Sequence, residues 1–141
     1  MRTPIMFALL LAAGCRDDKG AVLLHATHAM SVSPPLSTYS SSTAAAVFFP
    51  DGPVQLTATS NEGVLGIRLH GPLTRGTSLE LSTAPSVVQF DVDAASWANQ
   101  GGIIVVESVD PLIVRLVAVP MSPRNDFASG NFSFDGEGTF R

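Results

Sequence analysis

The sequence predicts an all-β protein: an antiparallel sandwich or a flattened up-and-down barrel of about eight or nine strands. Three observations lead to this prediction. Short segments alternate between apolar and polar side chains, which is the period of a strand with one face in a core. Gly, Pro, Asn and Asp separate these segments by connections too short for crossovers, so neighbouring strands are expected to run antiparallel. Only residues 94–100 have a helical pattern, sufficient for at most one short turn.

The chain begins with the pattern of a secretory signal peptide. Arg2 supplies a positive charge, residues 5–13 form an unbroken apolar run, and small residues follow it. As a helix this run would rise about 14 Å, which is short of the ~30 Å hydrocarbon core of a bilayer. Residues 1–14 are therefore expected to be cleaved off, not to span a membrane.

The tetrapeptide Ala12-Ala13-Gly14-Cys15 resembles the lipobox of bacterial lipoproteins, with Leu11 one position upstream of the family's leucine. The resemblance implies cleavage before Cys15, a diacylglycerol on its thiol and an acyl chain such as palmitate on the new amino terminus. Two or three such chains hold a protein stably at a bilayer. Residues 15–20 then form a lipidated cysteine and a charged tether that reaches at most ~17 Å. The alternative is a cytoplasmic protein in which Cys15 is an ordinary buried thiol.

The residue that follows the cysteine bears on the compartment. In Gram-negative lipoproteins an aspartate at this position resembles an inner-membrane retention signal. Here the position holds Arg16, and Asp17 comes after it. The expected location is therefore the cell envelope, with the lipid anchor in the outer membrane and the domain facing the periplasm or the surface.

Composition limits the mature chain further. Without residues 1–14 the chain keeps seven basic and twelve acidic side chains, and so a net charge of −5. This mildly acidic character argues against nucleic acid or an anionic lipid surface as a partner. Cys15 is the only cysteine, so the fold has no internal disulfide, and the cysteine pair of an immunoglobulin domain is missing. Residues 21–141 are expected to form a single all-β domain.

The first half of the mature chain contains four predicted strands. Pro34-Pro35 cannot donate to a β-ladder, so residues 31–43 are predicted to cross the surface as an extended loop. The predicted strands are residues 21–30, 44–49, 54–60 and 64–69.

The second half contains five predicted strands. Two of them, residues 103–109 and 112–119, are apolar on both faces and are expected to be central strands covered on both sides. In the last strand, Gly136 and Gly138 predict a bulge or a sharp bend. The other predicted strands of this half are residues 78–82, 87–93 and 131–141.

The helical window lies between two of these strands. Asp93 is a suitable amino-terminal cap for one short turn, and Gly101 a suitable end. The spacing Asp-x-x-x-Trp-x-x-x-Gly-Gly from Asp93 to Gly102, with the Phe-rich last strand, is similar to small all-β lipoproteins of the bacterial envelope whose function has not been characterised. That resemblance carries no functional residue across.

The ionisable residues form no pattern typical of catalysis or metal binding. His25 and His28 are three positions apart and would lie on opposite faces of a strand, so one is expected to be exposed and the other hydrogen-bonded. His70 is expected to be structural, because no partner base or orienting group can be named for it. A solvated acidic face is favoured over a calcium site for the acidic residues. These residues are Asp91, Asp93, Asp110, Asp126, Asp135 and Glu137. No catalytic residue, cofactor or metal is predicted.

Trp97, Asn99 and Gln100 form the most ligand-like group in the sequence. An aromatic plane beside two amides suits a small ligand such as a sugar. The alternative is a tryptophan that plugs one end of the core, which the preceding Ala94-Ala95 favours.

Three functions follow from these observations. The first is a lipid-anchored envelope protein whose non-catalytic β domain acts as an interaction or structural module, with the membrane and an envelope protein or cell-wall component as partners. The second is a small-ligand, for example carbohydrate, binding module at the Trp97 end. The third is a hydrolase, which only His70 and the acidic residues support.

Overall fold

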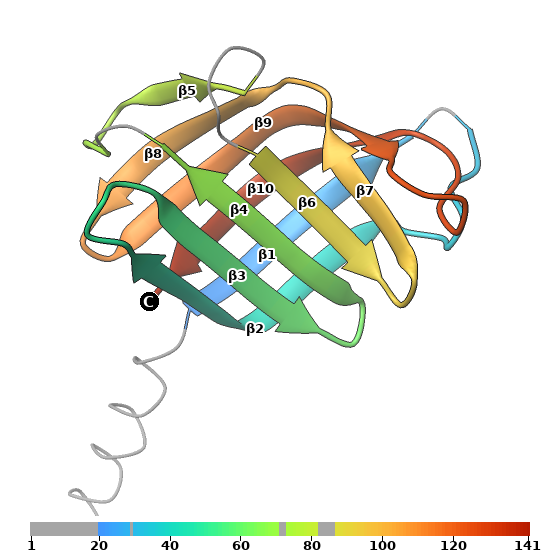
Figure 1. Cartoon of the computed structure of the whole chain (residues 1–141), viewed down its shortest axis with the longest axis horizontal. Helices are drawn as coiled ribbons and strands as arrows, with labels where there is room; N and C mark the ends of the chain where they lie inside the picture. Colours follow the sequence, from blue (N-terminus) through green and yellow to red (C-terminus); the bar gives the residue numbers. More distant parts are fainter. Residues whose placement is uncertain (1–19, 29, 71–72, 82–86) are drawn as a thin grey trace, which may run out of the picture.

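A computed structural model describes residues 20–28, 30–70, 73–81 and 87–141. These residues form ten β-strands and no helix, which confirms the all-β prediction (Figure 1). The strands are β1 Gly20–Thr27, β2 Thr38–Phe48, β3 Val54–Ser60, β4 Gly63–Leu69, β5 Ser78–Glu80, β6 Val87–Val92, β7 Ala95–Asn99, β8 Ile103–Val109, β9 Leu112–Pro123 and β10 Phe132–Phe140.

Eight of the strands close into a barrel. They follow the order β1-β2-β3-β4-β6-β7-β9-β10, and pairing of β10 with both β9 and β1 completes the ring. Every strand pairing is antiparallel. Within the ring the strands follow one another in chain order, and only β5 and β8 are left out. Strand β8 pairs with the first half of β9, and β5 pairs with the other edge of β8. Of the two architectures predicted, the structure has the up-and-down barrel.

The predicted helical turn at residues 94–100 is wrong, because this segment is strand β7. Residues Asp93 and Ala94 form a two-residue turn in which Val92 pairs with Ala95, and Asp93 has a φ of 52°. Aspartate tolerates this left-handed conformation better than most residues, and the turn suits a hairpin. Trp97 then pairs with Phe90 and Pro123, so tertiary pairing outweighs the local helical pattern.

Two further predictions need correction. The predicted loop at residues 31–43 ends earlier, because β2 begins at Thr38 and Tyr39 is fully buried opposite Leu24. Strands β8 and β9 are not covered on both sides: one face is buried, and the other includes the exposed side chains of Ile103 in β8 and Arg115 in β9. β8 lies outside the closed ring, and its apolar outer face therefore remains at the surface.

The predicted bend in the last strand is confirmed. The pairing of β10 with β9 shifts register between Phe134 and Gly136, and opposite this shift Ala118 takes a left-handed φ of 47°. A Cβ on Gly136 would lie 2.2 Å from the carbonyl oxygen of Leu23, so this position of β10 requires glycine.

Side chains fill the barrel. Alternate residues of the strands point inward, and the large ones among them are fully buried. Phe90 is central, with its ring in contact with those of Tyr39, Trp97, Phe132 and Phe134 at centroid distances of 5.2 to 6.4 Å. An eight-stranded barrel is just wide enough for such a packed interior. Binding surfaces must therefore be sought on the outer wall or at the barrel ends.

Candidate functional site

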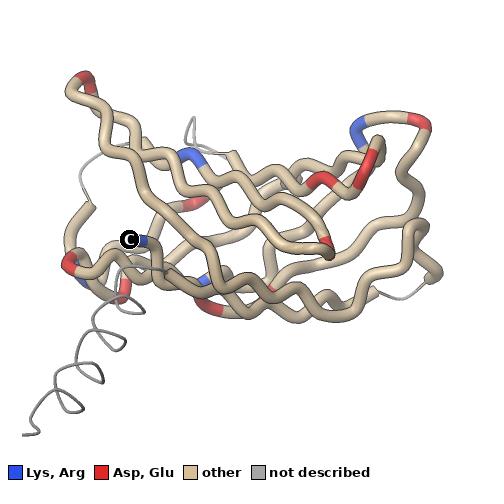
Figure 2. The backbone as a smooth tube through the Cα atoms, turned by 90° about the horizontal axis from the view of Figure 1, so that it is seen from below, with Lys and Arg blue, Asp and Glu red and all other residues tan. Residues whose placement is uncertain are grey.

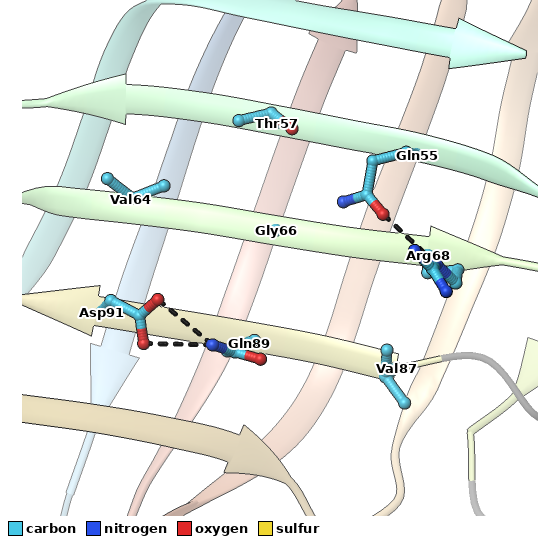
Figure 3. Close-up of a pocket in the computed structure, with 8 residues that line it drawn as sticks. All are labelled: Gln55, Thr57, Val64, Gly66, Arg68, Val87, Gln89 and Asp91. Carbon is cyan, nitrogen blue, oxygen red and sulfur yellow. Dashed lines mark hydrogen bonds between the residues drawn. The ribbon is translucent and has the colours of Figure 1, made fainter.

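The outer wall of the barrel is hollowed over strands β3, β4 and β6. Three outward-facing residues of each strand lie in register here, so that every residue of β4 has one neighbour on each side. The middle row is Thr57, Gly66 and Gln89. Gly66 has no side chain, and the sheet is therefore bare at the centre of the array (Figure 3). We call this hollow the Gly66 trough; its volume is about 430 Å³.

The walls of the trough are polar at two opposite corners. On one side Arg68 Nε donates a hydrogen bond to Gln55 Oε1 at 3.3 Å. On the other side Gln89 Nε2 donates to both carboxylate oxygens of Asp91, at 3.3 and 3.2 Å. Figure 3 shows these two pairs on either side of Gly66. Each pair holds an amide beside a charged group.

Two valines complete the lining. Val64 and Val87 are 41% and 48% exposed, and they lie at opposite ends of the trough. The trough therefore offers amide, guanidinium, carboxylate and hydroxyl groups beside methyl groups, with one positive and one negative charge. Such a lining can hydrogen-bond a polar partner of low net charge and pack against its apolar parts.

The lining of the trough contains few nucleophilic side chains. Among the described residues that line it there is no histidine, serine or cysteine, and the only hydroxyl belongs to Thr57. A nucleophile with an adjacent base is the usual minimum for covalent hydrolytic catalysis. The described lining does not supply that pair.

The structure does not bring the predicted ligand group of Trp97, Asn99 and Gln100 together on a surface. Trp97 is fully buried, and its indole Nε1 donates a hydrogen bond to the carbonyl oxygen of Gly130 at 3.0 Å. The Asn99 side chain accepts a hydrogen bond from the backbone amide of Val88 at 2.9 Å. The indole is thus part of the core and the Asn99 amide connects two strands, so Trp97 offers no exposed aromatic plane for a sugar.

The histidines and acidic residues lie apart. His25 and His28 are both exposed, whereas one exposed and one hydrogen-bonded histidine were expected. His70 is half-buried after the end of β4. Among the residues that the structure describes, no three His, Cys, Asp or Glu side chains are close enough to hold a metal ion. Asp135 is engaged elsewhere: its Oδ1 accepts a hydrogen bond from the amide of Ala118 at 2.8 Å.

The predicted signal peptide, Cys15 and most of the tether lie outside the described residues. Within the described ranges, no helix is long and apolar enough to cross a membrane.

The sequence predicts which side chains of each strand face outward, but not that those of three strands together line one trough. Its alternation places Gln55, Thr57, Arg68 and Gln89 on the polar faces of their strands. A glycine within a strand is also a recognised sign of close approach or of a gap in the side-chain layer. Nothing in one sequence shows that three such strands are neighbours in register, because the loop between β4 and β6 contains another strand.

No protein-family model matches the chain, and comparison with curated proteins and with solved structures finds no match either. The functional argument therefore rests on the residues themselves.

Proposed function

We propose that this chain is a lipid-anchored lipoprotein of the bacterial envelope, most consistent with the outer membrane, whose β-barrel domain is a non-catalytic interaction module. The anchor is the lipidated thiol of Cys15. The partner is an envelope protein or a cell-wall component that binds in the Gly66 trough.

One observation carries the binding part of this proposal. The barrel interior is filled by side chains, whereas the outer wall has a hollow at Gly66. This hollow lies between two hydrogen-bonded pairs, Arg68–Gln55 and Gln89–Asp91. Ligand sites usually combine a concave surface with a few fixed polar groups, and the trough has both. Its side chains are held by hydrogen bonds before a partner arrives, which reduces the entropy lost on binding.

Gly66 offers a direct test. A Cβ at this position would meet only Gln55 Nε2, at 3.7 Å, an ordinary contact. The variant Gly66→Thr should therefore fold, since threonine favours strands, while its side chain fills the trough. The control is Ala21→Thr, which adds a hydroxyl and a methyl group at an exposed position on the outer face of β1.

The measurement is photo-cross-linking in intact cells from a probe at Val64, with a probe at Leu23 for comparison. Leu23 is 50% exposed on β1, outside the trough. We expect a defined cross-linked product from position 64 that Gly66→Thr abolishes and Ala21→Thr does not. A product that forms equally from Leu23, or that survives Gly66→Thr, would show that the trough is not the binding surface.

A further inference from the structure

One end of the barrel carries exposed apolar side chains. Val47, Phe48 and Phe49 at the end of β2 are 52%, 58% and 46% exposed, and Val109 at the end of β8 is 40% exposed. We call these four residues the terminal rim. Phe48 and Val109 line one shallow groove of about 250 Å³, so β2 and the β8–β9 turn meet here.

Phe48 is exposed for a specific reason. After an irregularity near residues 42 and 43, the inward positions of β2 are Ala44 and Ala46, and Phe48 continues the same alternation. A phenylalanine on this side of a strand is normally covered by the core. Here the strand extends past the packed interior, and the ring projects from the barrel mouth beside the buried side chains of Leu112 and Phe140.

The chain enters the barrel at this same end. Gly20, the first described residue, pairs with Ala44, and the neighbouring Ala21 pairs with Thr139. A Cβ on Gly20 would lie 2.0 Å from the carbonyl oxygen of Thr139, so the two flanking strands enclose the entry point closely. At the same end of the barrel Arg141 pairs directly with β2, since its backbone amide donates a hydrogen bond to the carbonyl oxygen of Ala44 at 3.2 Å.

The length of the tether matches the position of the rim. Phe48 is four residues beyond the partner of Gly20 along β2, which is about 13 Å in the direction of the barrel end. The five residue steps from Cys15 to Gly20 span at most ~17 Å. A tether extended towards the barrel end therefore spans a length close to the distance from Gly20 to the rim, so that a lipid on Cys15 can hold the rim within a few ångströms of the bilayer surface.

We infer that the terminal rim inserts into the bilayer interface beside the anchor and fixes the orientation of the barrel on the membrane. The inference rests on the proposed lipidation of Cys15. Among the described residues, Asp51, Asp110 and Arg141 are charged side chains close to the rim, so both signs are present there. Figure 2 shows no continuous stripe of either sign along the described backbone. The contact depends on apolar insertion, with phenylalanines at the depth where amphipathic surfaces bind.

Insertion of the rim also orients the proposed binding site. The trough lies on the barrel wall, whose strands run from the rim to the opposite end. Val47 of the rim pairs directly with Gln55 of the trough, so with the rim at the membrane the Gln55 edge of the trough lies next to the lipid. The rest of the trough extends away from the membrane along β3, β4 and β6, towards Val64 and Asp91, where a partner can reach it.

The opposite end provides a matched control. Phe127, in the loop between β9 and β10, is 70% exposed, more than Phe48. If exposure alone determined contact with lipid, Phe127 would insert at least as readily. Of these two phenylalanines, the inference predicts contact with lipid for Phe48 and none for Phe127.

The test uses the full chain, produced in bacteria, extracted and reconstituted into phosphatidylcholine vesicles that carry bromine on the acyl chains. Intact mass first establishes whether Cys15 is lipidated. Phe48→Trp and Phe127→Trp then place an indole at each end, and the wild type supplies the background from Trp97, the only natural tryptophan. Both sites are exposed, so neither change should disturb the core.

We expect the added emission of Phe48→Trp to shift to shorter wavelength and to be largely lost in brominated vesicles, and that of Phe127→Trp to be unchanged. A lipidated protein that shows equal quenching at the two positions, quenching at 127 alone, or none at either would overturn the inference and leave the anchor intact. An unmodified Cys15 would remove the proposed anchor, and the inference with it.

Discussion

At the scale of single residues, the polar atoms of Tyr39 and Trp97 in the core donate hydrogen bonds to backbone carbonyl oxygens. The hydroxyl of Tyr39 is fully buried and lies 3.0 Å from the carbonyl oxygens of both Ala58 and Gly63. Desolvation by burial raises the pKa of Tyr39 above its ordinary value of 10.0. Folding therefore favours the neutral phenol over the phenolate.

Tyr39→Phe tests this role. Loss of the hydroxyl should destabilise the protein by about 1 kcal/mol at neutral pH, because the carbonyl oxygens of Ala58 and Gly63 lose the one proton that the hydroxyl can donate to them. The folded pKa is higher than the unfolded one, so the wild type has its full stability below pH 10.0 and loses part of it as the pH rises through the folded pKa. The difference in free energy of unfolding between wild type and variant should thus be constant near neutrality and shrink above pH 10.0.

Urea denaturation at several pH values measures this difference. Tyr39 is the only tyrosine, so the absorbance of tyrosinate in the folded protein reports its pKa alone. A folded protein that ionises at the ordinary value, or a difference that does not change with pH, would contradict the assignment.

At the scale of elements, the register shift between β9 and β10 closes the barrel. The amide of Ala118 points out of the ladder there, and the carboxylate of Asp135 accepts its hydrogen bond at 2.8 Å. Gly136 on the next position makes room for the carbonyl oxygen of Leu23 on β1. The bulge therefore depends on one acidic and one glycine residue in succession.

Asp135→Ala should reduce the free energy of unfolding by about 1 kcal/mol, since the amide of Ala118 loses its acceptor. Asp135→Asn keeps an oxygen in the same place and is the matched control, with a smaller expected loss. Thermal or urea unfolding of both variants distinguishes them. Equal losses would indicate that the negative charge of Asp135, and not its hydrogen bond, stabilises the bulge.

Sequence patterns predicted these elements unevenly, for physical reasons. Alternation located β3 and β4 almost to the residue, because one face of each strand is buried and the other is wet. It failed at β7, where the local Ala-Ala and Asp93 signals favour a helix and the deciding contacts come from β6 and β9. It also failed at the start of β2, where Tyr39 lies in a Ser-rich segment and is buried only because β1 and β3 flank it.

At the scale of the whole molecule, the barrel has a packed interior, a hollow on its outer wall and one end with exposed apolar side chains. The alternation of the sequence predicted the sheet and its polar faces, and the terminal pattern predicted the anchor. The Gly66 trough and the terminal rim were not predictable, since each combines residues from strands or turns that only the closed sheet places together.

The proposed anchor determines how all these surfaces are used. With Cys15 lipidated, the tether places the rim at the membrane and leaves the end of the trough at Val64 and Asp91 directed away from it. With a free amino terminus, the rim is an ordinary exposed apolar patch.

The most direct measurement is therefore the intact mass and amino-terminal modification of the protein extracted from separated inner and outer membranes. We predict a chain that begins at Cys15, carries a diacylglycerol on the thiol and an acyl chain on the amino group, and fractionates with the outer membrane. A chain that begins at Met1 with an unmodified thiol would contradict both the anchor and the compartment.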